Sequence, residues 1–279
     1  MANRIVCIGD VHGRSDLLVL LHTRIKDAYG DIPVYLTGDL IDRGPDSKGV
    51  IEYSIQNNFK SVIGNHDAWL CRLITKGEFD SFAIHNVMGG KKTIASYGSK
   101  LVKYAETTVR DLAVEFSGLV PAHHRDWLGQ LPYYRRVQLD SGEIYWILHA
   151  GLTNIGADAF YHESADDEDL MDHFNRYERA SDLLIWTQPS FPSSVITNGK
   201  KKIRGSDKDL NPRDNLYHFE NNAVQIFGHC VRKEPIYDSH YIAIDTGCGT
   251  KSPEKLTAVI LPEKIFISVG DGDLPNLWV

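Results

Sequence analysis

Side chains that can bind metal ions or transfer protons stand in five short, glycine-containing clusters of this sequence. Each cluster follows an apolar run, and the five read GDVHG (9–13), GDLIDRG (38–44), GNHD (64–67), LHAG (148–151) and FGHC (227–230). A single cluster of this kind is explained by a turn, because Gly, Asp and Asn favour turns. Turn formation alone does not explain why glycine beside a polar ligand returns five times in one chain.

Together the clusters supply a consistent set of candidate metal ligands. These are Asp10, His12, Asp39, Asn65, His149 and His229. Carboxylate, amide and imidazole groups without a thiolate suit Mn²⁺, Fe or Zn²⁺. The residue types therefore favour a metal site, provided that the fold brings the clusters together.

Strands and helices that alternate in the N-terminal part would bring the first three clusters to one place. Strands are predicted over Arg4–Gly9, Pro33–Thr37 and Lys60–Gly64, and helices from Ser15 or Asp16 to about Tyr29 and from Ser47 to about Asn57. Such βαβ units form a largely parallel sheet. Open sheets of this kind bind ligands outside the carboxyl ends of their strands, which is where the clusters stand.

The rest of the chain predicts a second sheet. A helical segment is expected at about 68–131, a helix N-terminus or solvated face in the acidic run 158–172, and a polar insertion at about 189–222. Further strands are predicted over Arg135–Leu139, Glu143–His149, Ala223–Phe227, Tyr241–Asp245, Leu256–Leu261 and Lys264–Val269. This order predicts a single domain over residues 1–279, with two sheets packed face to face and helices outside.

Composition narrows the class of protein. The chain has 279 residues, 42% of them hydrophobic, and its net charge of −7 argues against stable nucleic-acid binding, because such domains are usually basic. No apolar run reaches the roughly 18 residues of a membrane span, and the N-terminus lacks a signal-peptide pattern. The four cysteines are scattered and fit reduced thiols. We therefore expect a cytoplasmic protein with no membrane partner.

The five clusters, in this order, resemble the GDxHG, GDxxDRG, GNH[DE], H[AG]G and GH signatures of the phosphoprotein phosphatase (PPP) family of calcineurin-like metallophosphoesterases. The resemblance runs from Ile5 to about Leu261. The stretches GGKKTIASYG, LPYYRRV, DLLIW and IDTG also resemble the bacterial branch, which holds serine/threonine protein phosphatases and diadenosine tetraphosphate hydrolases. The resemblance implies a four-layer α/β/β/α sandwich with mixed sheets.

The resemblance also implies a dinuclear metal centre. Asp39 would bridge two divalent ions, for which Mn²⁺ is favoured and Fe or Zn²⁺ are alternatives. Asp10 and His12 would complete the first ion. Asn65, His149 and His229 would complete the second ion. A metal-bound hydroxide would then attack phosphorus directly, without a phosphoenzyme.

Further roles around the phosphate follow from the same resemblance. His66 would be the general acid, with its ring oriented by Asp42. Arg43 and Asn65 would bind phosphate oxygens, and the planar fork of the arginine suits that task. Further candidate substrate contacts are Arg14, Arg204 and Arg213. A solvated surface position is the simpler interpretation for Arg204 and Arg213, and for Arg14 a surface position at the start of a helix is an equal alternative.

Three features bear on the substrate. Protein phosphatases of this family generally carry a second phosphate-binding arginine, often after the LLIW-type stretch, where this chain has Thr187, Gln188 and Pro189. Asp67 in place of the usual Glu leans toward dinucleoside polyphosphate hydrolases. Asp42 leans the other way, because an oriented acid matters most for a poor leaving group such as a serine alkoxide.

The sequence therefore predicts a phosphoserine/phosphothreonine protein phosphatase. Hydrolysis of diadenosine tetraphosphate is the alternative, with the same chemistry and a nucleotide substrate. A non-catalytic scaffold is a third interpretation, since fold does not fix function. Loss of a ligand or of the acid would be expected of a scaffold, whereas all six ligand positions, His66 and Asp42 are present.

Overall fold

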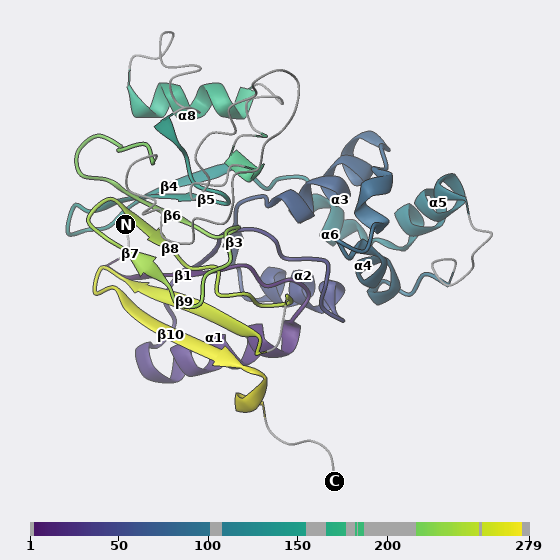
Figure 1. The fold of residues 1–279 in the computed structure, drawn as a ribbon, viewed down its shortest axis with the longest axis horizontal. Helices are drawn as coiled ribbons and strands as arrows, with labels where there is room; N and C mark the ends of the chain where they lie inside the picture. The colour runs from purple at the N-terminus through teal and green to yellow at the C-terminus, as the bar shows by residue number, and fades with distance from the viewer. Residues whose placement is uncertain are drawn as a thin grey trace, which may run out of the picture.

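The computed structural model describes residues 3–100, 108–154, 166–176, 182, 184–186, 216–250 and 253–274. One five-stranded sheet has the order β10-β9-β1-β2-β3 (Figure 1). Its strands are β1 (Ile5–Ile8), β2 (Val34–Leu36), β3 (Lys60–Ser61), β9 (Lys255–Leu261) and β10 (Ile265–Gly270). Strands β1, β2 and β3 are parallel, whereas β9 runs antiparallel to both β1 and β10. The carboxyl ends of β1, β2 and β3 therefore share one edge.

A second five-stranded sheet has the order β4-β5-β6-β8-β7. Its strands are β4 (Tyr134–Gln138), β5 (Ile144–Leu148), β6 (Val224–Phe227), β7 (Ile236–Tyr237) and β8 (Tyr241–Ala243). Strands β5, β6 and β8 are parallel, and antiparallel strands flank them on both sides. Strand β7 is absent from the sequence prediction, because two residues are too few to show an alternating pattern.

Apolar side chains from both sheets meet in the middle layer. Ile5 and Cys7 of β1 are buried in one cluster with Tyr145 and Ile147 of β5. The helices α1 (Ser15–Tyr29) and α2 (Ser47–Gln56) belong to the core on the other face of the first sheet. Helix α8 (Asp167–Arg176) packs over the second sheet through buried Leu170. The predicted α/β/β/α sandwich with mixed sheets is thus confirmed.

The segment predicted to be helical contains α3 (Asn65–Lys76), η1 (Ser81–Ile84), α4 (Gly90–Ser96), α5 (Val109–Leu119) and α6 (Ala122–Leu128). Figure 1 shows these elements grouped beside the sandwich. Helix α3 begins three residues earlier than the segment predicted from about residue 68. Asp67 explains the early start, because its carboxylate accepts the N–H of Gly64 at 2.9 Å and closes the first turn.

Several boundaries differ from the prediction for identifiable reasons. Strand β3 ends at Ser61 rather than Gly64, and the N–H of Ile63 donates to Pro132 outside the sheet. Ser15 does not cap α1, since its hydroxyl donates to Asp46 at 2.6 Å. Of the polar insertion at 189–222, only 216–222 fall within the described residues. No described helix combines the length and apolarity needed to cross a membrane.

Candidate metal centre

The six predicted metal ligands come together where strands of both sheets end. Asp10 and His12 follow β1, Asp39 follows β2, and Asn65 begins α3 after β3. From the second sheet, His149 follows β5 and His229 follows β6. All of them are buried except His229, which is partly exposed. We call these six residues the strand-end cluster.

Asp39 is the centre of the strand-end cluster. One carboxylate oxygen lies 3.3 Å from Nε2 of His149, and the other lies 3.5 Å from Nε2 of His12. The oxygen Oδ1 of Asn65 lies 2.9 Å from Nε2 of His149 and 3.0 Å from Nδ1 of His229. Asp39 belongs to two groups of possible ligands, one with His12 and His66 and one with His149 and His229. A shared carboxylate is what the predicted bridging role requires.

Asp10 joins the strand-end cluster from the first strand. Its carboxylate accepts the backbone N–H of His229 at 3.0 Å and the hydroxyl of Thr37 at 3.3 Å. Asp10 is 2% exposed, and burial raises the pKa of its carboxyl well above the usual value. The contact with His229 links the end of β1 to the end of β6, and hence one sheet to the other.

Unusual backbone conformations are concentrated in these loops. His12, Asp39, Asp42, Arg43 and His229 have φ angles of 46°, 51°, 71°, 62° and 63°. Non-glycine residues rarely adopt this left-handed region, and sparsely populated conformations of this kind cost of order 1–3 kcal/mol each. Such residues gather at functional sites, where the surrounding structure holds them.

The glycines of the clusters let the loops pack backbone against backbone. A Cβ atom on Gly44 would lie 2.1 Å from the carbonyl oxygen of His12, and one on Gly64 would lie 2.2 Å from the backbone nitrogen of Asp39. Any larger residue would push the ligand-bearing loops apart. Glycine therefore recurs in the sequence pattern because ligands from different strands must approach closely.

The hydrogen bonds of the histidines fit metal binding. Nδ1 of His149 lies 2.8 Å from the carbonyl oxygen of Thr37, and Nδ1 of His12 lies 3.0 Å from that of Ile41. A carbonyl only accepts, so Nδ1 carries the proton and Nε2 keeps its lone pair in the neutral ring. Burial lowers the pKa of both imidazoles, which favours this neutral form.

The lone pairs left in the strand-end cluster need a cation. Nε2 of His149 faces a carboxylate oxygen of Asp39, with no proton for the pair to share. Nε2 of His229 is buried without a hydrogen-bond partner, and burial lowers the pKa of this ring to about 3. Neutral imidazoles, carboxylates and an amide oxygen form a donor set for Mn²⁺, Fe or Zn²⁺. The residues present thus fit the predicted divalent ions.

The predicted acid and its orienting carboxylate form a fixed pair. Nδ1 of His66 donates to Oδ2 of Asp42 at 2.9 Å, and Asp42 is fully buried. Asp42 also accepts the indole N–H of Trp69 at 3.1 Å and the hydroxyl of Thr93 at 2.6 Å. Burial by itself would lower the pKa of His66, but Asp39 and Asp42 raise it. Nε2 of His66 is left to face the strand-end cluster.

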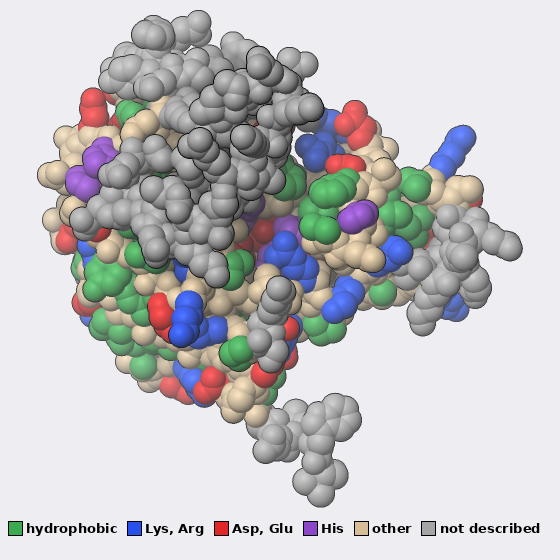
Figure 2. All heavy atoms as spheres, in the orientation of Figure 1, with side chains coloured by type: hydrophobic (Ala, Val, Ile, Leu, Met, Phe, Trp, Pro, Cys, Tyr) green, Lys and Arg blue, Asp and Glu red, His purple; other side chains and the backbone are tan. Residues whose placement is uncertain are grey.

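Arg43 spans the space between two of the histidines. Its Nη1 lies 2.8 Å from Nε2 of His12, and its Nη2 lies 2.9 Å from Nε2 of His66. The guanidinium thus reaches both a predicted ligand and the predicted acid, and it offers donors with the geometry that phosphate oxygens need. Figure 2 shows histidine, acidic and basic side chains together in a hollow beside the helical segment.

The other predicted arginine contacts are not brought to this place. The guanidinium of Arg14 pairs with the carboxylates of Asp16, Glu254 and Asp271, and its side chain is 9% exposed. Three carboxylate partners explain Arg14 as a structural residue, so the contacts do not support its predicted role in substrate binding. Arg204 and Arg213 lie outside the described residues.

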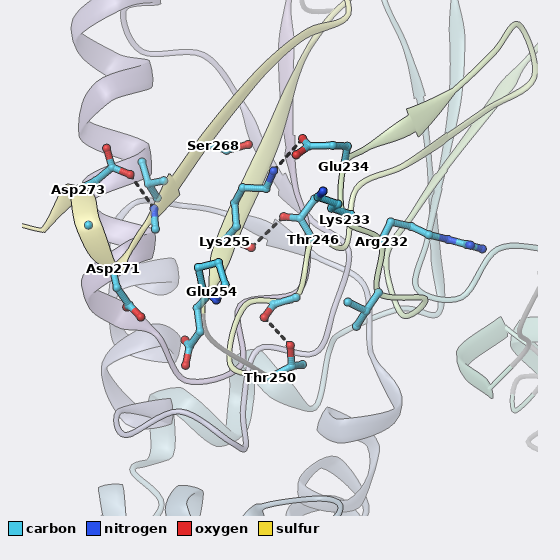
Figure 3. A pocket seen from close by; sticks show the side chains of 16 residues that line it. Arg232, Lys233, Glu234, Thr246, Thr250, Glu254, Lys255, Ser268, Asp271 and Asp273 are labelled. Carbon is cyan, nitrogen blue, oxygen red and sulfur yellow. Dashed lines mark hydrogen bonds and ion pairs between the residues drawn. The ribbon is translucent and has the colours of Figure 1, made fainter. Parts of the chain in front are cut away.

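A pocket of about 970 Å³ is lined by none of the residues of the strand-end cluster. Its lining includes Lys255 at the start of β9, and Asp271 and Asp273 in the short 3₁₀ helix that follows β10. Arg232 also lines it, and Figure 3 shows that side chain extending away from the other labelled residues. The described geometry therefore places the candidate chemistry at the strand ends and not in this pocket.

Sequence reasoning gave no role to several buried residues that hold the site together. Thr93 and Trp69 fix Asp42 through hydrogen bonds. Asp67 accepts the N–H groups of Leu40 and Gly64, which ties the second cluster to the third. Thr93 lies in the GGKKTIASYG stretch, which resembles the bacterial branch of the family, but nothing in the sequence indicates its contact with Asp42. Trp69 carried no comparable signal.

Comparison with known proteins identifies the class. The family model described as calcineurin-like phosphoesterase matches residues 3–232. The chain belongs to the calcineurin-like phosphoesterase family. This result agrees with the α/β/β/α sandwich and with the ligands at its strand ends.

Individual relatives match shorter parts of the chain. The symmetrical bis(5'-nucleosyl)-tetraphosphatase of Shigella dysenteriae is 41% identical over 70 residues, which are 24% of this chain and 25% of that protein. The enzyme of the same name from Cronobacter sakazakii is 45% identical over 65 residues, 23% of each chain. The chain thus matches about a quarter of the length of these relatives.

One solved structure matches over nearly the whole length. It is the crystal structure of a protein proposed to be a diadenosine tetraphosphatase, with 20% identity and a TM-score of 0.57. The match covers 97% of this chain and 94% of that chain. At this identity the likeness concerns the fold.

Proposed function

We propose that the protein is a metal-dependent phosphoric ester hydrolase, and that its substrates are phosphoserine and phosphothreonine in proteins. The buried Asp42–His66 pair carries this proposal. Its 2.9 Å hydrogen bond, held by Thr93 and Trp69, keeps the proton of His66 on Nδ1 and aims Nε2 at the strand-end cluster. An acid oriented in this way matters most when the leaving group is a poor one, such as an alkoxide.

The six residues of the strand-end cluster would hold two divalent ions, with Asp39 shared between them and Mn²⁺ as the proposed metal. When bound, these ions would neutralise phosphate charge and activate the attacking water. Arg43 and Asn65 would bind phosphate oxygens. His66 would act in its imidazolium form, which Asp39 and Asp42 favour by raising its pKa, and would deliver the Nε2 proton to the leaving oxygen while Nδ1 keeps its own. We also propose that the protein is cytoplasmic.

Hydrolysis of dinucleoside polyphosphates is a second candidate function. The names of the Shigella and Cronobacter relatives favour it. Asp67 in the GNHD cluster also favours a dinucleoside polyphosphate hydrolase. A nucleotide leaving group needs less protonation than an alkoxide, so the two candidates differ in how much they depend on His66.

The test is turnover of a phosphothreonine peptide and of diadenosine tetraphosphate, measured side by side with Mn²⁺. A kcat/KM higher by about tenfold or more for the peptide supports the protein phosphatase, and the reverse ratio supports the nucleotide hydrolase. His66→Asn should lower peptide turnover by roughly 10²–10⁴-fold. His22→Asn is the matched control, because its ring on α1 bonds Tyr53 and does not touch the strand-end cluster. No turnover of either substrate, with metal-free protein, would support a scaffold instead.

A further inference from the structure

A second group of possible metal ligands lies on the helices, apart from the strand-end cluster. It consists of Glu52 on α2 and of His123 and His124 on α6, and its ligand atoms lie within 4.8 Å of one another. We call these three residues the α2–α6 cluster. Helix α2 packs against both α4 and α6, which Figure 1 shows beside it. None of the five glycine-containing clusters includes these residues.

Both imidazoles converge on a single oxygen atom. Nε2 of His123 and Nε2 of His124 each lie 2.9 Å from Oε2 of Glu52. Their ring centroids are 4.5 Å apart and the planes meet at 81°. Neighbouring residues in a helix usually point in different directions, yet here both rings turn toward the same carboxylate at the start of α6. Three potential ligand atoms therefore share one small volume.

The donor set matches a zinc-type ion. Two imidazole nitrogens and one carboxylate form a His₂Glu set, which protein zinc sites use with a fourth position open to water. Ligand atoms about 2.0–2.1 Å from a tetrahedral zinc lie about 3.3 Å from one another. The two nitrogen–oxygen separations in the α2–α6 cluster are 2.9 Å, a few tenths of an ångström shorter than this, and all three ligand atoms lie within 4.8 Å of one another.

The surroundings also fit a bound ion. Nδ1 of His124 lies 2.9 Å from the hydroxyl of Tyr97, and such a partner orients a ligating imidazole. The His124 side chain is fully buried, whereas those of His123 and Glu52 are 53% and 38% exposed. One ligand is thus held rigidly, and the other two leave a path from solvent.

We propose that Glu52, His123 and His124 bind one transition-metal ion of the zinc class, which joins α2 to α6. The site is separate from the proposed dinuclear centre and does not depend on the proposed function. Without an ion the same residues form hydrogen bonds, and these hold the pKa of the Glu52 carboxyl at about 2. The two arrangements therefore differ in tautomer. Without an ion each Nε2 donates its proton to Glu52, whereas with an ion each Nε2 is unprotonated and the proton of the neutral ring is on Nδ1.

Metal content of the full-length protein tests the site. Chelator-stripped protein is incubated with excess Zn²⁺, passed through a desalting column, and the zinc retained per chain is measured by elemental analysis. Glu52→Gln and His123→Gln should each retain one ion fewer than the unchanged protein. His22→Gln, a histidine of similar setting that faces a tyrosine hydroxyl, should retain as much as the unchanged protein. Both substituted ligands are partly exposed, so folding is kept.

A second measurement separates this site from the strand-end cluster. Zn²⁺ affinity is titrated by calorimetry in an Asp39→Asn background, where the strand-end cluster is impaired. His123→Gln should weaken the remaining binding by about tenfold or more, as expected from removal of one of three ligands. Equal zinc content in the unchanged protein, Glu52→Gln and His123→Gln would overturn the proposal. Unchanged affinity in the Asp39→Asn background would overturn it as well.

Discussion

The strand-end cluster and the α2–α6 cluster use the same ligand types in opposite settings. In the first, ligands come from the ends of strands in two sheets and are almost entirely buried, and three of the six, His12, Asp39 and His229, have a strained positive φ. In the second, they stand on regular helices, and only His124 is fully buried. Strained, close-packed loops can aim several groups at one substrate, whereas a helix surface offers a few ligands at the spacing that the helix dictates.

The contacts around each cluster indicate which of the two is suited to catalysis. The strand-end cluster is held by the carbonyl of Ile41 beside His12 and the carbonyl of Thr37 beside His149, and both Arg43 and the predicted acid lie against it. The α2–α6 cluster has orienting contacts from the Tyr97 hydroxyl to His124 and from the Gln56 amide to Glu52. We therefore expect substitutions in the first cluster to affect turnover and those in the second to affect stability and zinc content.

Asp39→Asn should have the largest effect. Asn tolerates the positive φ of 51° at this position, so the loop is kept while the shared negative charge is lost. Both metal groups lose their common carboxylate, and kcat/KM should fall by more than the roughly 10²–10⁴-fold that a general acid contributes. Metal content by elemental analysis and kcat/KM with Mn²⁺ check this.

The control for Asp39→Asn is Asp31→Asn, whose carboxylate pairs with Lys26 on the surface. That variant should keep both its metal and its turnover. If Asp39→Asn retains two ions per chain, the strand-end cluster is not organised around a shared carboxylate. The contrast between the two clusters would then lose its main support.

Asp42→Asn should have the next largest effect. The amide keeps the shape of the side chain but can present its NH₂ to Nδ1 of His66, which removes the preference for a proton there. Turnover should fall by about 10–100-fold, as for other groups that orient a functional histidine, with metal content unchanged. Steady-state kinetics on the peptide, with elemental analysis of the same samples, measure both quantities.

Thr93→Val is the matched weaker variant, because it deletes the 2.6 Å hydrogen bond to Asp42 and keeps the side-chain shape. Its loss of turnover should be smaller than that of Asp42→Asn. A result in the opposite order would mean that Asp42 does not act through its hydrogen bond to His66.

The sequence predicted those site residues whose position follows from their immediate neighbours in the chain. Asp10, His12 and Asp39 follow apolar runs within a few residues, and the rule that strand ends share an edge places them together. Thr93 and Asp42 are 51 residues apart, so no local pattern predicts their contact. The α2–α6 cluster could not be predicted for the same reason, because His124 and Glu52 are 72 residues apart.

For the fold, too, the sequence predicted the elements better than their boundaries. Apolar runs predicted every described strand except β7, which has two residues, and the helices of the 68–131 segment were expected as a group. Boundaries depended on single contacts such as that of Asp67 with Gly64, which start α3 early. The carboxylate partners of Arg14 could not be predicted for the same reason, because Glu254 and Asp271 are distant from it in sequence.

Gly44→Ala should have a moderate effect, on stability more than on chemistry. The added Cβ would meet the His12 carbonyl oxygen at 2.1 Å, and overpacking of this kind costs about 1–3 kcal/mol. Gly118→Ala is the control, because this glycine lies inside α5 with open space around it. That variant should be more stable by about 0.5–1 kcal/mol. Urea unfolding of both variants measures these changes, and equal stabilities would show that the loops of the strand-end cluster are not tightly packed.

Tyr97→Phe should have the smallest effect and tests whether the two clusters are independent. The change removes the hydrogen bond to Nδ1 of the buried His124 and should cost about 1 kcal/mol of unfolding free energy. Tyr97 is the C-cap of α4, the helix that also carries Thr93, so a path from Glu52 to Asp42 exists through one helical turn. We expect urea unfolding to register the loss while kcat/KM stays within about twofold of the unchanged protein, because α4 is also held by packing of buried Ile94. A fall in kcat/KM comparable to that of Thr93→Val would show instead that α4 transmits the state of the α2–α6 cluster to His66.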